Sequence, residues 1–548
     1  AAKDNCEART FRTSANCADA ALGVASAQGK ADKDGKRKGI SMSDENKVTA
    51  AEVPKGQNAA AAGKGASEPK LPAVSKPLKV FYGVGDFGFN IMNSVENYYF
   101  VFFLTNCAML DPVLAGIVST VGSIIDAIVG WLWGAIINTI KPMRWGRYRS
   151  WLFIMPWIVP ILFGLDYFRF SDNPVITAVL ITIFYVASHC CWDFPYVANV
   201  SLIAVVGQTP EDRAHLASTR GMWSNASKIL FAYIFPPVAM LGAMLLGNQN
   251  SDPAAAPANY AFAAFVFGCV FAALYNVHFA MTKGYEKEYS KEELANWKSS
   301  KKADKTNNSA GDLGRSIAQN PNVIFLMLGD VAKWIFNFVV GGTAVYYFTF
   351  VAFNPGMLAT YIFASNVACV IGAYLGGPVA KALKGSKNAV ITAFIVMMPT
   401  TAMRPKGISL MMVVVVCMSI AQAGYGLIYA VIPAMYGDCV VYSEWKTGKN
   451  SAGWISGLQV LPLKIGFFAR GVVIPAILGA AGFVAGMTAD QSTPALQEGI
   501  VNGWFVLPAI LCVISMLILL FGYRINNEVL LKCENEIAER KKNEKDSE

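Results

Sequence analysis

Apolar stretches long enough to cross a lipid bilayer recur along this chain from Lys79 onward, and polar breaks separate them. A helix rises 1.5 Å per residue, so about 20 apolar residues span a hydrocarbon core about 30 Å thick. Twelve such stretches occur, at residues 79–105, 111–138, 151–170, 174–206, 221–247, 258–281, 321–353, 356–383, 388–403, 408–437, 452–486 and 497–523. The pattern predicts an all-α membrane protein with twelve transmembrane helices.

The positive residues between these stretches predict the orientation. The loop after the second stretch carries Lys141, Arg144, Arg147 and Arg149, whereas the loops after the first, fifth, seventh and eleventh stretches contain neither Lys nor Arg. Lys and Arg concentrate in cytoplasmic loops, so both termini are predicted to be cytoplasmic. An even number of crossings requires both termini on the same side.

A charged segment at residues 282–320 separates six predicted helices from six more. We therefore expect two pseudo-symmetric six-helix bundles, at residues 77–281 and 321–524, with a cytoplasmic central loop between them and a charged cytoplasmic tail at 525–548. This is the plan of the major facilitator fold, whose halves are parallel repeats.

A short internal similarity agrees with such a repeat. Asp86 follows a glycine and precedes Asn93, and Asp330 follows a glycine and precedes Asn337 at the same offset. A Tyr-Tyr-Phe triplet follows in both halves, with offsets that differ by about one helical turn. Equivalent positions in two halves are where a parallel repeat is expected to show.

Residues 1–76 differ from the rest of the chain. They are rich in Ala, Lys, Gly, Ser and Asp, and their one aromatic residue is Phe11. Such a composition buries too little apolar surface to repay ordering, so a disordered extension is predicted. The codons for residues 35–39 can form a purine-rich tract like a bacterial ribosome-binding site, so we expect a native start at Met42 and a bacterial source.

Composition excludes several classes of protein. Hydrophobic residues make up 54% of the chain and charged residues 15%, against about 25% charged residues in soluble domains. The net charge of +9 lies in short loops and tails and does not form a basic face, so no nucleic-acid partner is expected. The eleven cysteines show no metal-site spacing, and no nucleophile-base pair indicates an enzyme. We expect no cofactor and no resident metal.

Polar residues inside the apolar stretches are the candidates for function, because ionisable groups at membrane depth are energetically expensive. Asp86, Asn90, Asn93 and Asn97 are spaced by 4, 3 and 4 residues, which places them on one stripe of the first helix. Further ionisable residues are Glu96, Asp126, His189, Asp193, Arg220, Lys228, Asp330, Lys333, Lys464 and Arg470. They bind solute or cation, or they neutralise one another to hold helices together.

Burial depth favours function for three of these groups. Asp126, Asp193 and Lys464 fall well inside long apolar stretches. Arg220 and Arg470 lie nearer to the expected helix ends, where snorkelling or structural pairing is an equal alternative. Aromatic residues near the polar groups, such as Tyr429, suit the apolar face of a sugar ring, although interfacial aromatics are more common.

Several motifs resemble the glycoside-pentoside-hexuronide:cation symporters, the major facilitator group that contains the melibiose carrier. The run from Arg144 to Trp151, Arg-Trp-Gly-Arg-Tyr-Arg-Ser-Trp, carries the likeness most clearly. Further matches are Tyr82-Gly83-Val84-Gly85, Asp126-Ala127-Ile128, Asp193-Phe194-Pro195, the run from Gly437 to Lys446, and Lys464. Together they span residues 79–524 in the expected order.

The resemblance implies a secondary transporter in the cell membrane that carries a sugar, glycoside or hexuronide together with a cation. The implied substrate-binding residues are Asp86, Asn90, Asp193, Arg220, Tyr429 and Lys464, and the implied coupling residues are Asp126, Asp193 and Lys464. The implied cytoplasmic gate comprises Arg144, Arg147, Arg149, Asp438 and Glu444. A monomer in the lipid bilayer is expected.

The implied cation site departs from the family pattern. The second acid of its D-x-x-x-D motif is replaced by Gly130, and Cys190 stands where the family has a hydroxyl. Sodium needs several oxygen ligands, whereas a proton needs one carboxylate, so proton coupling is predicted over sodium coupling. Two other hypotheses remain open: a carrier of a non-sugar solute such as a lysolipid, and a transport-incompetent sensor.

Overall fold

A computed structural model of the protein describes residues 72–247, 256–295, 319–402, 411–448, 455 and 458–547. Of the extension predicted to be disordered at residues 1–76, residues 1–71 and the predicted start at Met42 lie outside the described residues, as does most of the predicted central loop. Residues 72–76 are described, and Ser75 caps a helix that begins at Lys76. Every long regular element in the described part is a helix. Its one pairing of extended backbone is an isolated bridge between Met143 and Gly146.

The first half of the chain contains nine helices among its described residues. They are α1 (Lys76–Phe81), α2 (Val84–Phe102), α3 (Pro112–Thr139), α4 (Arg149–Ile154), α5 (Val159–Asp166), α6 (Pro174–Val206), α7 (Pro210–Leu245), α8 (Pro257–Met281) and the short α9 (Lys291–Ala295). A π-helical turn, η2 (Phe103–Cys107), extends α2, and a 3-10 turn, η3 (Met155–Trp157), joins α4 to α5 with a bend of 48°.

The second half repeats this organisation. Its helices are α11 (Pro321–Tyr346), α12 (Met357–Ala382), α13 (Ser386–Ala402), α14 (Met411–Thr447), α16 (Leu461–Ala480), α17 (Pro494–Val501), α18 (Leu507–Gly522) and α19 (Asn527–Ser547). The π-helical turns η4 (Tyr347–Val351) and η7 (Asn502–Val506) follow α11 and α17, and the 3-10 turn η6 (Ala489–Gln491) precedes α17.

Helix starts follow local chemistry. Asp111, Asn173 and Thr209 accept backbone N–H bonds at the starts of α3, α6 and α7, and each is followed by a proline. Proline lacks an N–H that would be unpaired there in any case. The fifth stretch was predicted to begin at residue 221, but α7 already begins at Pro210. The polar first turns continue the helix beyond the apolar stretch, which hydrophobicity alone does not reveal.

Each of the twelve predicted stretches contains a helix. By length and composition, nine described helices can cross a membrane, or ten if the bent pair of α4 and α5 is one span. The apolar part of α13 is shorter than these, and α2 carries Asp86, Glu96 and several asparagines. The all-helical fold is confirmed, whereas the count of twelve crossings and the cytoplasmic side of the termini stay predictions.

The internal repeat extends further than the sequence indicated. The π-helical turns η2 and η4 follow Asp86 and Asp330 at the same distance along the chain. Both end in the same hydrogen-bond pattern, and Met109 and Phe353, at equivalent places just after them, both have positive φ, of 59° and 50°. The first and seventh predicted helices are therefore structural equivalents.

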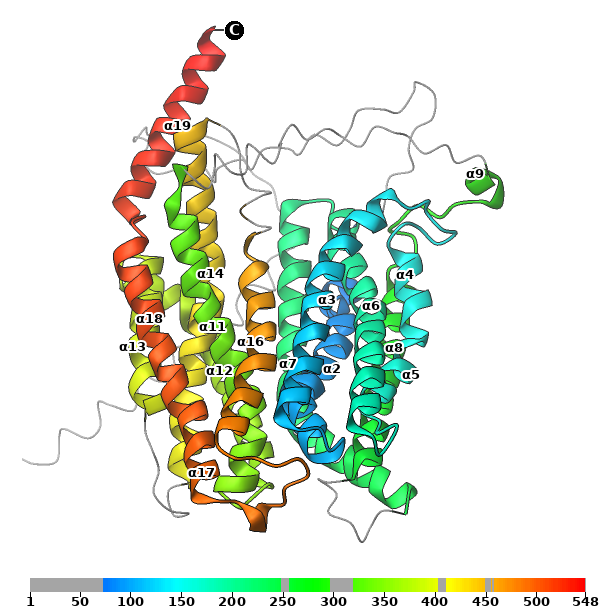
Figure 1. The fold of residues 1–548 in the computed structure, drawn as a ribbon. Helices are drawn as coiled ribbons and strands as arrows, with labels where there is room; N and C mark the ends of the chain where they lie inside the picture. The colour runs from blue at the N-terminus through cyan, green and yellow to red at the C-terminus, as the bar shows by residue number, and fades with distance from the viewer. Residues whose placement is uncertain are drawn as a thin grey trace, which may run out of the picture. The chain divides into compact units, whose positions relative to one another are not determined.

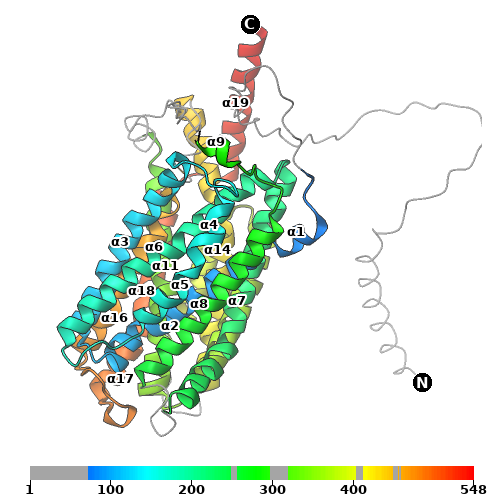
Figure 2. The same cartoon turned by 90° about the vertical axis from the view of Figure 1, so that its right-hand side faces the viewer.

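The helices form two groups, α2–α8 and α11–α18 (Figure 1). The groups meet where α3 packs on α16, α2 on α11, and α7 on α12. In both views α9 and α19 lie at one end of the groups and α17 at the other (Figure 2). Polar side chains along these interfaces form the candidate site.

Candidate substrate and coupling site

Asp86 and Arg220 form a two-pronged ion pair between α2 and α7. The Arg220 Nε lies 2.7 Å from Asp86 Oδ2, and a terminal guanidinium nitrogen bonds Oδ1. Asn199 of α6 donates a further hydrogen bond of 3.1 Å to Oδ2. The guanidinium carbon also lies 5.3 Å from the centre of the Tyr196 ring. Two predicted substrate-binding residues therefore meet in one largely buried cluster.

Asn90 lies one turn further along α2. Its side chain donates to the Ser224 hydroxyl of α7 at 2.8 Å and to the Asp86 backbone carbonyl at 2.9 Å. Asn90 and Ser224 are both partly accessible, so their remaining hydrogen-bonding capacity can serve a ligand hydroxyl. The polar stripe of α2 thus continues beside α7.

The three predicted coupling residues come together from three helices. Lys464 of α16 lies 2.7 Å from Asp126 of α3 and 4.0 Å from Asp193 of α6. The two carboxyl groups also interact with each other. Because α16 belongs to the second bundle and α3 and α6 to the first, this cluster links the two bundles.

Tyr429 of α14 faces the first bundle. Its side chain is 48% exposed and interacts electrostatically with Tyr196 and Arg220. The ring of Trp334 lies 5.9 Å away, and the Lys333 ammonium lies 5.5 Å from the Tyr429 ring centre. Tyr429 is therefore an accessible aromatic group opposite the Asp86–Arg220 pair.

The predicted gate residues fall into two groups. Arg149 is buried in the first bundle, where it bonds Glu288 at 3.1 Å and stacks on Phe279. Nearby, the Glu286 carboxylate accepts the backbone N–H groups of Arg147, Tyr148 and Arg149. Arg144 joins the same region through its carbonyl, which accepts from the Tyr289 N–H. Asp438 and Glu444 lie on the last turns of α14, which packs on α19.

A further buried network joins candidate residues that the sequence did not assign to the substrate, coupling or gate sites. Arg470 of α16 bonds the Glu96 side chain and, at 3.2 Å, the Glu96 backbone carbonyl. His189 lies 3.1 Å from Glu96, and the Tyr185 hydroxyl donates to it at 2.8 Å. The sequence signal was Glu96 beside the asparagine stripe, but spacing alone could not assign Arg470 as its partner.

Hydrogen bonds between the bundles continue toward the end formed by η2 and η4. Thr105 bonds the Tyr346 hydroxyl at 2.7 Å, and its carbonyl accepts from Gly486 at 2.9 Å. Asn106 donates to the Met487 carbonyl at 3.0 Å. The described bundles are thus tied together at this end, which the predicted topology makes extracellular.

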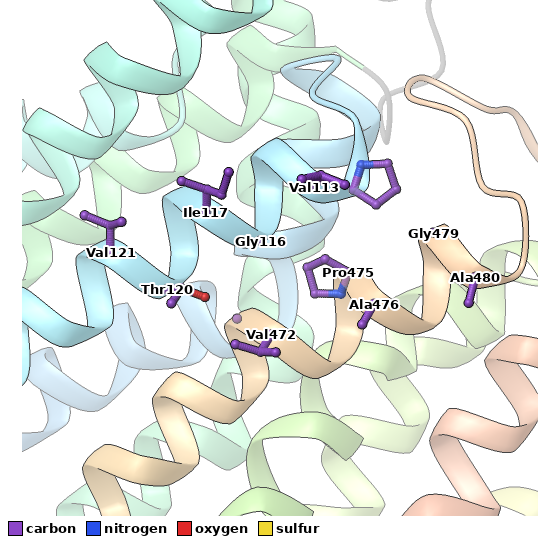
Figure 3. A pocket seen from close by; sticks show the side chains of 12 residues that line it. Val113, Gly116, Ile117, Thr120, Val121, Val472, Pro475, Ala476, Gly479 and Ala480 are labelled. Carbon is purple, nitrogen blue, oxygen red and sulfur yellow. The ribbon is translucent and has the colours of Figure 1, made fainter.

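A cavity of about 480 Å³ lies elsewhere, between α3 and α16 (Figure 3). Its lining is apolar apart from Thr120 and includes Gly116 and Pro475. Val113 and Ile117 on its rim are 71% and 52% exposed, so the cavity is a groove on the outer surface. It contains none of the predicted substrate-binding residues.

Two packed helical groups with charged clusters between them define a secondary transporter of the major facilitator fold. Residues 81–527 match the family described as MFS/sugar transport protein, and the chain belongs to that family. Its members are transporters and not enzymes. The family and the long apolar helices of the described residues together make the chain a multi-pass protein of the cell membrane.

Relatives and solved structures agree with this assignment. The chain is similar to a glucuronide carrier protein homolog of Escherichia coli, with 22% identity over 84% of this chain and 95% of the relative. It is 23% identical to an isoprimeverose transporter of Lactiplantibacillus pentosus, over 76% of this chain and 82% of the relative. A solved bacterial homologue of the lysosomal transporter Spinster has a TM-score of 0.57 and 14% identity, covering 84% of this chain and 99% of that one. This last likeness concerns the fold alone.

Proposed function

We propose that this chain carries a sugar, glycoside or hexuronide together with a cation, by alternating access, and that the cation is a proton. Relatives named for a glucuronide and for isoprimeverose support a glycoside substrate. The two bundles would rock about the clusters between them and expose the site to each side in turn. The protein would act as a monomer.

The observation that carries the proposal is the cluster of Asp126, Asp193 and Lys464. It joins three helices across the two bundles, so a change of its charge acts on both bundles at once. Two carboxyl groups in contact do not both ionise readily, so the pair can hold a proton. The Lys464 ammonium already supplies a positive charge at 2.7 Å, which disfavours a second, metal cation.

The sugar would lie between Asp86, Asn90 and Arg220 on one side and Tyr429 on the other. Charged groups and amides bind hydroxyls by directional hydrogen bonds, and an aromatic ring packs on the apolar face of a pyranose. A non-sugar carrier of lysolipids would need an apolar opening, and the groove between α3 and α16 is apolar. That groove lacks charged groups for a headgroup, so the sugar hypothesis is preferred.

The test is transport in proteoliposomes that contain the purified full chain. A panel of labelled monosaccharides, glycosides and hexuronides would be offered under an imposed pH gradient, an imposed sodium gradient, or neither. The proposal expects accumulation with the pH gradient, inside alkaline. Stimulation by sodium alone at fixed pH would overturn proton coupling, and no uptake of any sugar would overturn the substrate class.

A further inference from the structure

Lys228 lies midway along α7, at a depth where a charged side chain is expensive unless it has a partner or a task. It makes no hydrogen bond or ion pair with any residue that the structure describes. Among those residues, the ionisable group that interacts with it electrostatically is the thiol of Cys369 on α12. A thiol offers an ammonium far less than a carboxylate does.

The other cations deep in the described helices are all paired. Their partners are Asp86 for Arg220, Asp330 for Lys333, Asp126 for Lys464, and Glu96 for Arg470. A protonated Lys228 therefore has no neutralising carboxylate among the residues that the structure describes. Such a charge beside a proposed substrate site is suited to bind an anionic group of a ligand.

The alignment of α2 with α7 locates this charge. Asp86 meets Arg220, and one turn further along both helices Asn90 meets Ser224. The next turn of α7 carries Lys228, and continuing the same alignment along α2 brings it between the levels of Asn93 and Asn97. Lys228 thus lies on the same stripe of α7 as the two residues that contact the proposed sugar-binding side chains of α2.

The carboxylate of Glu96, on α2 at this level, is already paired with Arg470 and His189, and the other polar side chains of α2 here are neutral. Asn93 is partly accessible and makes no hydrogen bond with a described residue, and the Asn97 side-chain oxygen is buried without a partner. From the second bundle, Asn366 of α12 lies 3.5 Å from the Tyr98 hydroxyl. Amide and ammonium donors without a competing carboxylate are the groups that bind carboxylates and sulfonates.

We propose that Lys228 is a specificity residue that binds an anionic group, a carboxylate or sulfonate, on the transported sugar. The inference rests on the proposed function. Arg220 and the Asn90–Ser224 pair would hold hydroxyls, and Lys228 would receive the anion one turn, about 6 Å, beyond Ser224. The chain would then prefer acidic sugars to their neutral counterparts.

The experiment uses three methyl glucosides that differ at one position, where they carry a hydroxymethyl, a carboxylate or a sulfonomethyl group. Binding to the purified full chain would be measured by calorimetry, and uptake would be measured in proteoliposomes. Lys228→Met removes the charge and keeps the stem, whereas Lys228→Arg keeps the charge. Lys381→Met, at an exposed position near the end of α12, is the matched control.

For the natural chain we expect tighter binding of at least one anionic glycoside than of the neutral one. Lys228→Met should weaken anion binding about tenfold or more, because a charge-assisted bond is lost, and should leave neutral-sugar affinity unchanged. Lys228→Arg should restore most of the difference. Equal affinities in the natural chain, or equal losses for all three glycosides in Lys228→Met, would overturn the inference alone. No binding of any glycoside would overturn the proposed function with it.

Discussion

Arg470 of α16 and Glu96 of α2 form a buried ion pair that crosses from one bundle to the other. His189 and Tyr185 satisfy further lone pairs of the carboxylate. A buried ion pair with this many partners holds α2 and α16 in one arrangement. The pair must rearrange whenever the two bundles separate where these helices meet. The pair is therefore a structural lock on one conformation.

Removing one member of this lock should destabilise the protein. Arg470→Met leaves the Glu96 charge buried without its main partner, and breaking such pairs costs about 3–5 kcal/mol. Thermal melting of the purified chain in detergent would measure the loss. Adding Glu96→Gln to Arg470→Met should recover part of it, since both charges are then gone.

The control for the lock is Arg169→Met. Arg169 pairs with the exposed Asp172, and exposed pairs contribute little, so melting should not change. If Glu96→Gln and Arg470→Met lower stability additively when combined, the two residues do not act as a pair.

The coupling cluster gives a second prediction. Asp193→Ala should abolish sugar binding and uptake while the protein still reaches the membrane, because Asp193 interacts both with Tyr196, beside Arg220, and with Lys464 of the coupling cluster. Uptake in cells and the amount of protein in the membrane fraction would be measured together. Asp172→Asn, at an exposed loop position, is the control. Uptake that survives Asp193→Ala would show that the site assignment is wrong.

The two-pronged ion pair between Arg220 and Asp86 gives a third prediction. Lysine cannot make the two parallel bonds that Arg220 makes with Asp86, so Arg220→Lys should weaken sugar affinity about tenfold or more. Calorimetry on the purified chain would report the change. Arg213→Lys, on the first turns of α7 where the side chain bonds the Gly207 carbonyl, should bind sugar normally. Unaltered affinity in Arg220→Lys would remove Arg220 from the site.

Much of the fold could be predicted because apolar length and loop charge are local properties. They indicated a helix in each stretch and the division into two bundles. The start of α7 at Pro210 was missed because polar turns can continue a helix outside the bilayer. The equivalence of the π-helical turns η2 and η4 could not be predicted from the sequence either, since a π-helical turn has no simple sequence signature.

The candidate site was predictable only in part. Asp126, Asp193 and Lys464 were recognised by depth and by motif, and the structure brings them together. The Glu96–Arg470 pair joins residues far apart in the chain, and spacing within one helix contains no information about such a partner. Lys228 could be noticed in the sequence, but its lack of a described partner required the structure.

Glu286 gives a prediction of pH dependence outside the membrane-spanning helices. Burial raises the pKa of this carboxyl, and the three backbone N–H donors offset part of the rise. The folded protein then holds a proton that the unfolded chain releases near pH 4.3, about the ordinary value for Glu. Stability from this group is present at lower pH and is lost as pH rises through the raised pKa.

Glu286→Gln should therefore flatten the decline in melting temperature between about pH 4 and the raised pKa. Melting curves of the natural chain and the variant across this range would show the difference between their slopes. Glu292→Gln, at an exposed position in α9, should follow the natural chain. Parallel slopes for Glu286→Gln and the natural chain would contradict the expected shift.

The contact between α12 and α14 gives the last prediction, because two glycines allow these backbones to touch. A Cβ at Gly372 would overlap the Ala423 carbonyl oxygen, and one at Gly426 would overlap the Cys369 carbonyl oxygen. Backbone cannot yield as a flexible side chain can, so Gly372→Ala should force the helices apart and lower the melting temperature. Gly437→Ala, on α14, meets nothing within 4 Å. Since alanine favours helix over glycine by about 0.5–1 kcal/mol, Gly437→Ala should raise stability slightly. Melting of the two variants in the same detergent should therefore shift in opposite directions, and a shift in the same direction would contradict the close backbone contact.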